Sequence, residues 1–414
     1  MKACPSCYRL FPNDGGFCPI DGAKLAPAGD VTPPADPEDK RVGRAVCQGR
    51  YRIYRRVADG GTGRVYQALD TKERRGVALK ILHPEVATDE ISVERFKREF
   101  HLSRELSHPH IIDVFSFEAT EDESFALVME YLEGEELRML LKREKVLPPE
   151  RLLRILSQTA LGAQEAHDRK IVHRDLKPDN VFLCHTRDGD DVKILDFGSV
   201  RDNSEGAKKL TVMGTTIGSP FYMAPEQAQG LPSLDHRADV WSLAAIAYEC
   251  LTGRVPFEGG TGPAILLAIL SNDPKPPSEV GAAQHVPVTL DPVIESALAK
   301  EPLHRTASVG ALVDQIGAAY GLTGDHREWS TCTPEELARR IRDGLPAALA
   351  AHKAKTGSAG SLAAMDSAFT EERPNAFSED LVMGVPQQRP SWVVPALIAG
   401  LVIVGAVVAL VFLR

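Results

Sequence analysis

The alternation of hydrophobic and polar positions predicts strands in the first third of the chain. Residues 56–66 follow the pattern of a strand, a glycine-rich turn and a second strand, and residues 77–80 alternate again. Residues 94–106 carry charged groups at helical spacing and predict a helix. The apolar run over residues 124–132 predicts a further strand that leads into a polar segment. This part of the chain is therefore expected to mix several strands with one helix.

The most uniformly apolar stretch lies at residues 392–413, which contain no charged residue and a single proline, Pro395. About 20 apolar residues span the hydrocarbon core of a bilayer. A buried core helix is the alternative, but such uniform hydrophobicity at the end of the chain favours a membrane span. We therefore expect residues 391–414 to form one transmembrane helix. It would anchor the chain by its tail in the cell inner membrane, with the preceding residues on the cytoplasmic side.

Two segments have compositions typical of linkers. Residues 26–48 begin within a stretch rich in Pro, Ala and Asp, and residues 346–390 lose periodicity and are rich in Ala, Ser, Gly and Pro. Between the two lies the bulk of the chain, followed by a short helical extension over residues 322–345 in which Thr333 is suited to be the N-cap. We expect both linkers to be flexible.

The overall composition indicates the size of the domain and one excluded class of partner, but not the activity. With 414 residues, 43% of them hydrophobic, the chain is expected to form one large domain with smaller appendages. Its net charge of −9 and isoelectric point near 5.8 give no electrostatic attraction to nucleic acid, so no nucleic-acid partner is expected.

Three cysteines lie close together at the N-terminus. Cys4 and Cys7, then Cys18 and Asp21, form two short knuckles over residues 1–25 that resemble a small zinc ribbon, with Asp21 where the fourth cysteine is usual. A carboxylate is an acceptable zinc ligand, and so short a segment needs a metal to fold. The alternative is a disordered arm with reduced cysteines. We expect a structural Zn²⁺ bound by these four residues.

The strongest chemical signal is the run His173-Arg174-Asp175-Leu176-Lys177-Pro178-Asp179-Asn180, followed by Asp196-Phe197-Gly198. This spacing offers a base, a phosphate-directed cation and oxygen ligands for a divalent cation. Val77-Ala78-Leu79-Lys80 lies upstream and Ala224-Pro225-Glu226 downstream. Over about residues 51–320, the chain resembles the Hanks-type serine/threonine protein kinases of bacteria.

The resemblance implies an α+β fold, the bilobal protein kinase fold with a small β-rich N-lobe and a larger α-helical C-lobe, over residues 49–321. It also implies ATP-dependent transfer of the γ-phosphate to serine or threonine of protein substrates, with Mg²⁺ or Mn²⁺ as cofactor. The alternatives are a pseudokinase scaffold that binds nucleotide or partners without transfer, and a small-molecule kinase. The second would lack the long segment that ends in Ala224-Pro225-Glu226.

The family's functional residues carry over by position. Asp175, Lys177, Lys80 and Glu99 are the implied catalytic residues, with Lys80 expected to pair with Glu99, and Asn180 and Asp196 are the implied Mg²⁺ ligands. The first glycine of the family's loop is replaced by Ala58. The implied nucleotide contacts are Val57, Gly60, Gly61, Gly63, Val65, Ala78, Lys80, Glu130, Leu132, Asn180, Leu183 and Asp196.

Regulation and scaffolding residues follow from the same resemblance. Arg174 suggests control by phosphorylation of the loop after Asp196, where Thr211, Thr215 and Thr216 are the candidates for autophosphorylation. We also expect self-association of the chain at the membrane, because clustering would promote phosphorylation of one copy by another. Two further matches are structural: an ion pair between Glu226 and Arg305, and Asp239 as the anchor of the catalytic loop.

Overall fold

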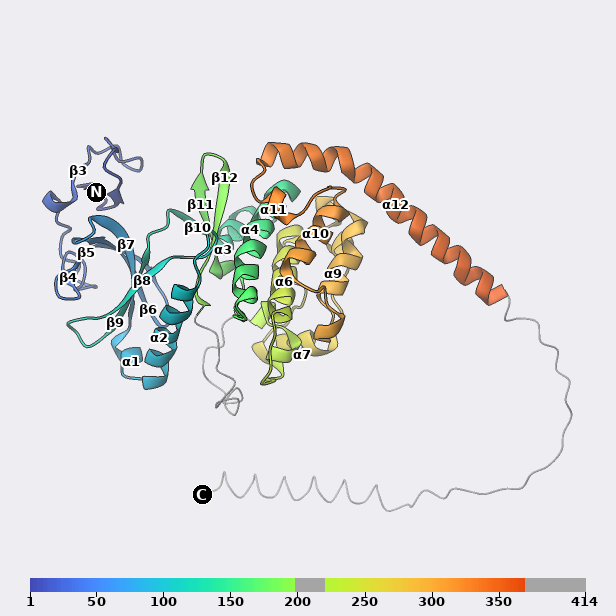
Figure 1. Ribbon diagram of the computed structural model, residues 1–414, viewed down its shortest axis with the longest axis horizontal. Helices are drawn as coiled ribbons and strands as arrows, with labels where there is room; N and C mark the ends of the chain where they lie inside the picture. Colours follow the sequence, from blue (N-terminus) through green and yellow to red (C-terminus); the bar gives the residue numbers. More distant parts are fainter. Residues whose placement is uncertain (198–219, 369–414) are drawn as a thin grey trace, which may run out of the picture. The chain divides into compact units, whose positions relative to one another are not determined.

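The computed structural model describes residues 1–197 and 220–368, with side chains through residue 356 (Figure 1). Met1 to Thr356 form one unit, and the chain from Gly357 onward forms another. The threonines 211, 215 and 216, and the predicted transmembrane residues 391–414, lie outside the described residues. Within the described part, no helix combines the length and hydrophobicity needed to cross a bilayer.

A six-stranded antiparallel sheet forms the N-lobe, in the order β4-β5-β6-β7-β9-β8. The alternating side chains of β7 separate two cores, with Val77 and Leu79 in one and Ala78 in the other. The strands predicted on both sides of the glycine turn and at residues 77–80 and 124–132 are present. The strand bounds are β4 Ala45–Val46, β5 Tyr51–Asp59, β6 Gly63–Asp70, β7 Arg75–Leu82, β8 Val114–Ala119 and β9 Phe125–Glu130.

Two helices accompany this sheet: α1 (Pro84–Ala87) and α2 (Glu90–Glu105), which packs on β8 and β9. The helix that was predicted over residues 94–106 begins one turn earlier in the structure, at Glu90. The cause is Asp89, whose carboxylate accepts a hydrogen bond of 3.1 Å from the backbone N–H of Ser92 and so caps the helix.

The C-lobe is helical and is built around α4 (Pro149–Asp168) and α6 (Arg237–Thr252). Trp241 on α6 is fully buried and stacks on Phe257 with ring centroids 5.4 Å apart. Further helices of this lobe are α3 Leu137–Glu144, α5 Pro225–Ala228, α7 Gly262–Ser271, α8 Pro277–Val280, α9 Asp291–Ala297 and α10 Val309–Ala319. A small sheet of β10 (Gly134–Glu136), β11 (Val181–Thr186) and β12 (Gly189–Ile194) accompanies them (Figure 1). The predicted bilobal architecture is confirmed.

The N-terminal segment forms its own three-stranded sheet of β1 (Lys2–Ala3), β2 (Leu10–Phe11) and β3 (Ala26–Pro27), with β1 in the middle. The prediction that residues 26–48 are a flexible linker is corrected by the structure. Ala28 and Val31 are buried against Tyr54 of β5, and β4 joins the edge of the N-lobe sheet. The apolar side chains within this Pro- and Asp-rich stretch give it a fixed position.

The segment after α10 also contains more packed and helical structure than predicted. In α11 (His326–Trp329), Trp329 is fully buried in the C-lobe core, so this extension is an integral part of that lobe. Helix α12 runs over Pro334–Ala368, with Thr333 Oγ1 accepting a hydrogen bond of 3.3 Å from the N–H of Glu336, as expected of an N-cap. The predicted flexible linker from residue 346 is therefore helical up to residue 368.

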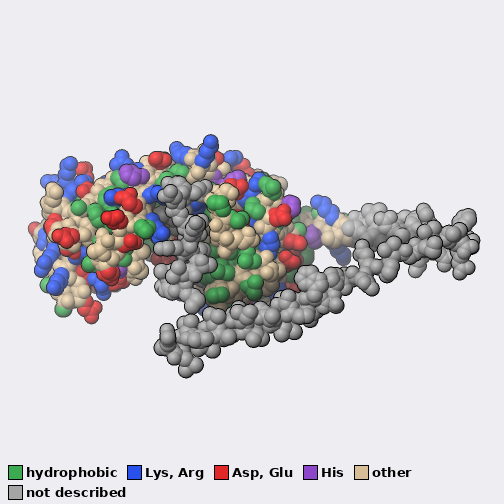
Figure 2. Space-filling view, turned by 90° about the horizontal axis from the view of Figure 1, so that it is seen from below, with side chains coloured by type: hydrophobic (Ala, Val, Ile, Leu, Met, Phe, Trp, Pro, Cys, Tyr) green, Lys and Arg blue, Asp and Glu red, His purple; other side chains and the backbone are tan. Residues whose placement is uncertain are grey.

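Charged side chains of both signs are interspersed over the molecular face seen in Figure 2. This face therefore presents no uniformly basic surface to a polyanion.

Candidate active site

Lys80 on β7 is held between two carboxylates from distant parts of the chain. Its Nζ lies 3.0 Å from Oε1 of Glu99 on α2 and 2.8 Å from Oδ1 of Asp196, which follows β12. The predicted pairing of Lys80 with Glu99 is thus present, and Asp196 shares the same ammonium group. One cation and two carboxylates form a single charge network at the junction of the lobes.

Burial decides how this network ionises. It raises the pKa of Glu99 to about 7, although the nearby Lys80 acts in the opposite direction. Burial would also raise the pKa of Asp196, but the charge of Lys80 and the hydrogen bonds from Lys80 and Glu99 together outweigh it, and the pKa is lowered. The Asp196 side chain is 48% exposed against 10% for Glu99, so Asp196 is the carboxylate that a cation from solvent can reach.

The catalytic-loop residues converge on Asp175. Lys177 Nζ lies 2.7 Å from Asp175 Oδ2, and Asn180 Nδ2 donates to the backbone carbonyl of Asp175 at 2.7 Å. The loop has left-handed backbone at Arg174 (φ 67°), and so does Asp196 (φ 55°). Such conformations are rare in non-glycine residues and cluster at functional sites.

Buried Asp239, at the start of α6, holds the loop from behind. Its carboxylate accepts hydrogen bonds from the backbone N–H groups of His173 (2.8 Å) and Arg174 (2.9 Å) and lies 2.7 Å from Nε2 of His167. Burial would raise the pKa of Asp239, but the hydrogen bond and charge of His167 outweigh it and the pKa is lowered. The side chain is fully buried and hydrogen-bonds the loop backbone, which fits its expected role as the anchor of the loop.

The glycine-rich turn links β5 and β6. Gly60 N–H donates to the carbonyl of Gly63 at 3.0 Å, and a Cβ on Gly63 would lie only 2.3 Å from the carbonyl oxygen of Ile81. Gly63 is therefore required by packing as well as by its proposed approach to phosphate. Ala58 pairs with Val65 across the two strands, so the strand pairing accommodates alanine in place of the family's first glycine.

The apolar residues among the implied nucleotide contacts belong to two clusters, one in each lobe. Val65, Ala78 and Leu132 belong to one apolar cluster, which also contains Met129. Leu183 on β11 is fully buried in the C-lobe core. Val57 is 42% exposed, and Gly60 and Gly61 are also exposed, so these three are the more accessible residues of the predicted set.

Glu130 ends β9 and begins the hinge. Its side chain turns away from the apolar cluster, forming an ion pair of 2.7 Å with Lys193 and accepting a hydrogen bond of 2.8 Å from the N–H of Asp113. Any contact of Glu130 with a base must therefore come from its backbone, as the resemblance implies.

A second ion pair braces the C-lobe. Arg305 donates through both terminal nitrogens to Glu226, each at 2.6 Å, and both side chains are almost fully buried. The predicted structural ion pair is present.

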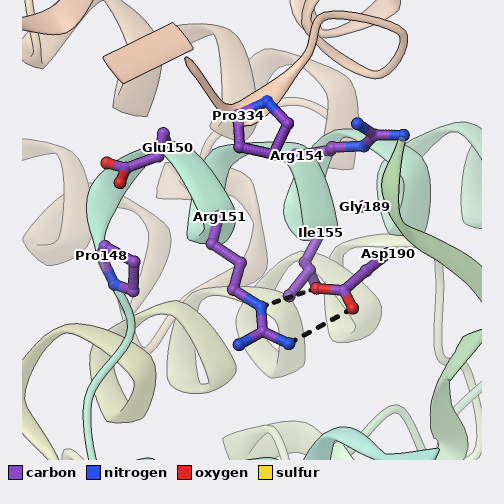
Figure 3. Close-up of a pocket in the computed structure, with 8 residues that line it drawn as sticks. All are labelled: Pro148, Glu150, Arg151, Arg154, Ile155, Gly189, Asp190 and Pro334. Atoms are coloured by element: carbon purple, nitrogen blue, oxygen red, sulfur yellow. Dashed lines mark hydrogen bonds and ion pairs between the residues drawn. The ribbon is translucent and has the colours of Figure 1, made fainter. Parts of the chain in front are cut away.

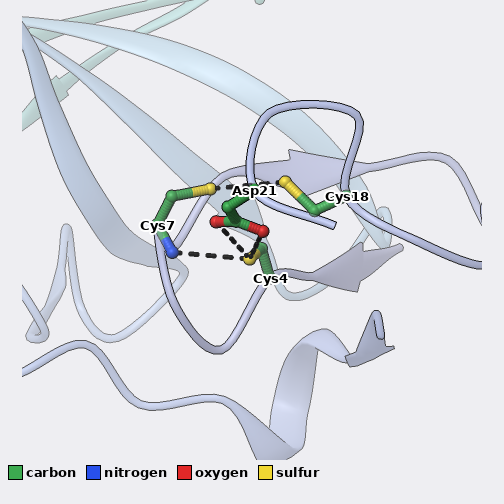
Figure 4. A group of neighbouring side chains, drawn as sticks. All are labelled: Cys4, Cys7, Cys18 and Asp21. Carbon is green, nitrogen blue, oxygen red and sulfur yellow. Dashed lines mark hydrogen bonds between the residues drawn. The ribbon is translucent and has the colours of Figure 1, made fainter. Parts of the chain in front are cut away.

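The four predicted metal ligands lie together on the loops beside the N-terminal sheet (Figure 4). The donor atoms of Cys4, Cys7, Cys18 and Asp21 are all within 4.8 Å of one another. The sulfurs of Cys7 and Cys18 are 3.6 Å apart, close to the about 3.8 Å between two thiolates on a tetrahedral zinc. The N–H groups of Ser6 and Cys7 point at the Cys4 sulfur, at 3.3 and 3.4 Å, and would stabilise a thiolate there. The four residues thus fit a tetrahedral divalent cation.

A separate pocket of about 270 Å³ lies where α4 begins, between the β11–β12 turn and Pro334 (Figure 3). Arg151 crosses it and pairs with Asp190, with Nε 2.6 Å from Oδ2. It contains none of the catalytic or nucleotide residues described above. Its other lining residues are Pro148, Glu150, Arg154, Ile155 and Gly189.

Two histidines were missed by sequence reasoning. His167 contacts Asp239 from 72 positions away, and His173 Nε2 lies 2.8 Å from the carbonyl of Leu195, with its ring 4.7 Å from that of Phe197. His173 stands inside the recognised motif, so its position was a usable signal. His167 had none, because only the packing of α4 against α6 brings it to Asp239.

Comparison with known proteins agrees with this geometry. The family model described as Protein kinase domain matches residues 51–315. Serine/threonine-protein kinase pkn3 of Myxococcus xanthus is 35% identical over 283 residues, 68% of this chain and 51% of that protein. For serine/threonine-protein kinase PrkC of Bacillus subtilis the values are 33% over 279 residues, 67% and 42%. The chain thus spans about half or less of the length of these curated relatives.

Among solved structures, the kinase domain of Mycobacterium tuberculosis PknI aligns with a TM-score of 0.52 and 28% identity. The alignment covers 66% of this chain and 96% of that domain.

Proposed function

The chain belongs to the protein kinase family, and we propose that it transfers the γ-phosphate of ATP to serine or threonine hydroxyls of proteins. The observation that carries this proposal is the completeness of the site. Lys80, Glu99, Asp175, Asn180 and Asp196 are all present, and the first two and the last share one charge network. A pseudokinase lacks at least one of these groups.

The residues divide the work of phosphoryl transfer. The carboxylate of Asp175, 41% exposed, would accept a hydrogen bond from the incoming hydroxyl and take its proton. Lys177, 2.7 Å from that carboxylate, would offset charge on the phosphate in transfer. Asn180 and Asp196 would hold Mg²⁺, which neutralises the phosphates when bound. Lys80, oriented by Glu99, would hold the α- and β-phosphates.

The proposal is tested by transfer from γ-labelled ATP with Mg²⁺ to the full chain and to a generic basic protein. Asp175→Asn should abolish label incorporation, whereas Asp188→Asn, the same change on the exposed β11–β12 turn, should leave it unchanged. Loss in both variants, or in neither, would contradict the assignment of Asp175.

A scaffold that binds nucleotide without transfer is the second candidate, and Ala58 is the observation that favours it. Alanine has less conformational freedom than glycine and would stiffen the loop over the phosphates. It removes no charged group, so transfer is the stronger proposal. A full chain that binds ATP but never transfers phosphate would reverse this order.

We further propose that Cys4, Cys7, Cys18 and Asp21 bind a structural Zn²⁺. The convergence of three sulfurs and one carboxylate in a segment this short supports it, because metal binding would supply its folding free energy. Purified full chain should contain about one zinc ion per molecule, and Cys18→Ser should lose it. Cys332→Ser, which changes a thiol far along the chain, should keep it. Retention of zinc in Cys18→Ser would refute this ligand set.

We propose that residues 391–414 anchor the protein in the cell inner membrane, with the kinase domain in the cytoplasm. The uniformly apolar sequence of residues 392–413 supports this. The full chain should stay with the membrane fraction after washing with concentrated salt, and a chain ending at residue 389 should not. Equal partitioning of the two would exclude the anchor.

Autophosphorylation at Thr211, Thr215 or Thr216 is proposed as the activating event, supported by Arg174 directly before Asp175. If one copy of the chain phosphorylates another, self-association at the membrane would increase the rate of this modification. Mass mapping of fully active protein should find phosphate on this loop. A fully active protein with all three threonines unmodified would refute the idea.

A further inference from the structure

The N-terminal sheet shares a hydrophobic core with the N-lobe. Four buried residues of this sheet and of the segment just after it pack with Tyr54 of β5, whose hydroxyl also donates to the carbonyl of Ala28. The packing extends to Leu69 on β6. The metal-binding segment is thus fixed to the two strands that carry the glycine-rich turn. The four residues, each at most 6% exposed, are Ala3, Leu10, Ala28 and Val31.

Gln67 on β6 joins the two sheets through its side-chain amide. Its Nε2 donates to the carbonyl of Leu10 and its Oε1 accepts from the N–H of Leu10, both at 3.4 Å. Gln67 is 1% exposed, so loss of Leu10 as partner would remove the acceptor of its NH₂ group at a buried position. Leu10 pairs with Ala3, the residue next to Cys4, so the metal site lies one strand away from this contact.

Gln67 also faces the nucleotide site. It lies on the same face of β6 as Val65, two positions away, and pairs across the sheet with Ala78 of β7. Its Oε1 accepts a second hydrogen bond, of 3.1 Å, from Nε of Arg55. Arg55 then donates through Nη2 to the hydroxyl of Tyr131 at 2.8 Å.

Tyr131 occupies the hinge between Glu130 and Leu132, the two residues implied in adenine binding. A continuous path of hydrogen bonds therefore runs from β2 through Gln67 and Arg55 to the hinge. On one side the path includes Gln67, which pairs with Ala78, and at its other end it includes Tyr131, the neighbour in sequence of Glu130 and Leu132.

We propose that metal occupancy at Cys4, Cys7, Cys18 and Asp21 controls nucleotide affinity, with Gln67 and Arg55 as positioning residues that carry the effect to the hinge. The inference rests on the proposed metal site and the proposed kinase function. Metal loss unfolds the short β1–β2 segment, which removes Leu10 from Gln67. The amide and Arg55 then rearrange, and Tyr131 loses its fixed position. The metal and the nucleotide thereby bind cooperatively.

The experiment measures the Kd of a fluorescent ATP analogue for the full chain, first loaded with zinc and then stripped by a chelator. Metal content is measured on each sample. The test variants are Gln67→Met, which keeps the size but not the hydrogen bonds, and Tyr131→Phe, which removes only one hydroxyl. Thr32→Val is the control: Thr32 accepts from Arg52 Nη2 at 2.7 Å, which is a contact with β5 outside the path. Thermal unfolding checks that each variant is folded.

Stripping should raise the Kd of the unmodified chain and of Thr32→Val by about fivefold to tenfold, and restored Zn²⁺ should reverse this. Tyr131→Phe and Gln67→Met should bind weakly even with zinc and change less than about twofold on stripping. An unchanged Kd after zinc is lost would overturn the inference while leaving the metal site and the kinase function standing. An equal response of Tyr131→Phe and the unmodified chain would overturn the path. A chain that never holds zinc would refute the metal site, and failure of every form to bind the analogue would refute the nucleotide site itself.

Discussion

Asp239→Asn should strongly reduce the proposed phosphoryl transfer while leaving the chain folded. The carboxylate receives three hydrogen bonds in a fully buried environment, two from the backbone of the catalytic loop and one from His167. Oδ2 serves both His173 and His167, and Oδ1 serves Arg174. Asparagine keeps one acceptor oxygen and replaces the other with an NH₂ group, which would face at least one N–H donor.

The size of the effect follows from these contacts. Hydrogen bonds to a buried charged acceptor contribute about 1.5–3 kcal/mol each. Loss of one or two of them at the loop would cost about 3 kcal/mol, which corresponds to a fall in kcat of about a hundredfold if the whole cost appears in the transition state. The KM for ATP should change little, because Lys80 and the purine walls do not contact Asp239.

Steady-state phosphorylation of a generic protein substrate, with thermal unfolding of the same samples, measures both consequences. Asp235→Asn is the matched control, since its side chain is 50% exposed and it caps the N–H of Arg237 two residues later. A kcat for Asp239→Asn within about threefold of the unmodified chain would refute the anchoring argument. A variant unfolded at the assay temperature is to be assayed again below its Tm.

Three further outcomes are expected. Lys80→Met should lower kcat/KM by at least about a hundredfold with the fold retained. Transfer assays would measure the activity, and circular dichroism would check the fold. Substantial activity in this variant would contradict the role of Lys80 in phosphate binding. Arg305→Met leaves Glu226 buried without its cation and should reduce the free energy of unfolding by about 3–5 kcal/mol in urea titrations, whereas an unchanged midpoint would show that the pair is not structural. Because the folded-state pKa of Glu99 is raised from 4.5 to about 7, its contribution to stability is present below its unfolded pKa and is lost as pH rises through 7. Urea unfolding of nucleotide-free Glu99→Gln across that window should lack this decline, and an unaltered profile would contradict the assigned shift.

Sequence reasoning succeeded where chemistry is local. Asp175, Lys177 and Asn180 lie within six residues of one another, so their spacing alone brings them to one loop. The pairing of Lys80 with Glu99 was also accessible, because a strand and the helix after it form a short-range unit. The contact of Asp196 with the same ammonium group of Lys80, 116 positions away, depends on how the two lobes pack together.

Composition gave a wrong prediction where a few buried apolar residues hold a mostly polar segment in place. Residues 26–48 have the Pro- and Asp-rich character of a linker, yet Ala28 and Val31 meet the buried ring of Tyr54 and fix the segment. The amide of Gln67 and the backbone of Leu10, 57 positions apart, carry no sequence signal at all. Only tertiary packing makes them partners.

The helical extension was underestimated for a related reason. Residues 346–390 were expected to be flexible because they lose periodicity and are rich in Ala, Ser, Gly and Pro, and Pro346 itself disfavours a helix interior. Helix α12 nevertheless passes through it. The alanine-rich residues that follow have the highest helix propensity, which offsets the loss of one hydrogen bond.

The most direct test of the central claim is the mass of the full chain after incubation with ATP and Mg²⁺, measured beside Asp175→Asn. The unmodified chain should gain whole phosphoryl groups, with peptide mapping locating them on serine or threonine, and the variant should gain none. A nucleotide-bound chain that modifies neither itself nor a generic protein substrate, or equal modification of the variant, would contradict the claim that this is a serine/threonine kinase whose catalytic base is Asp175.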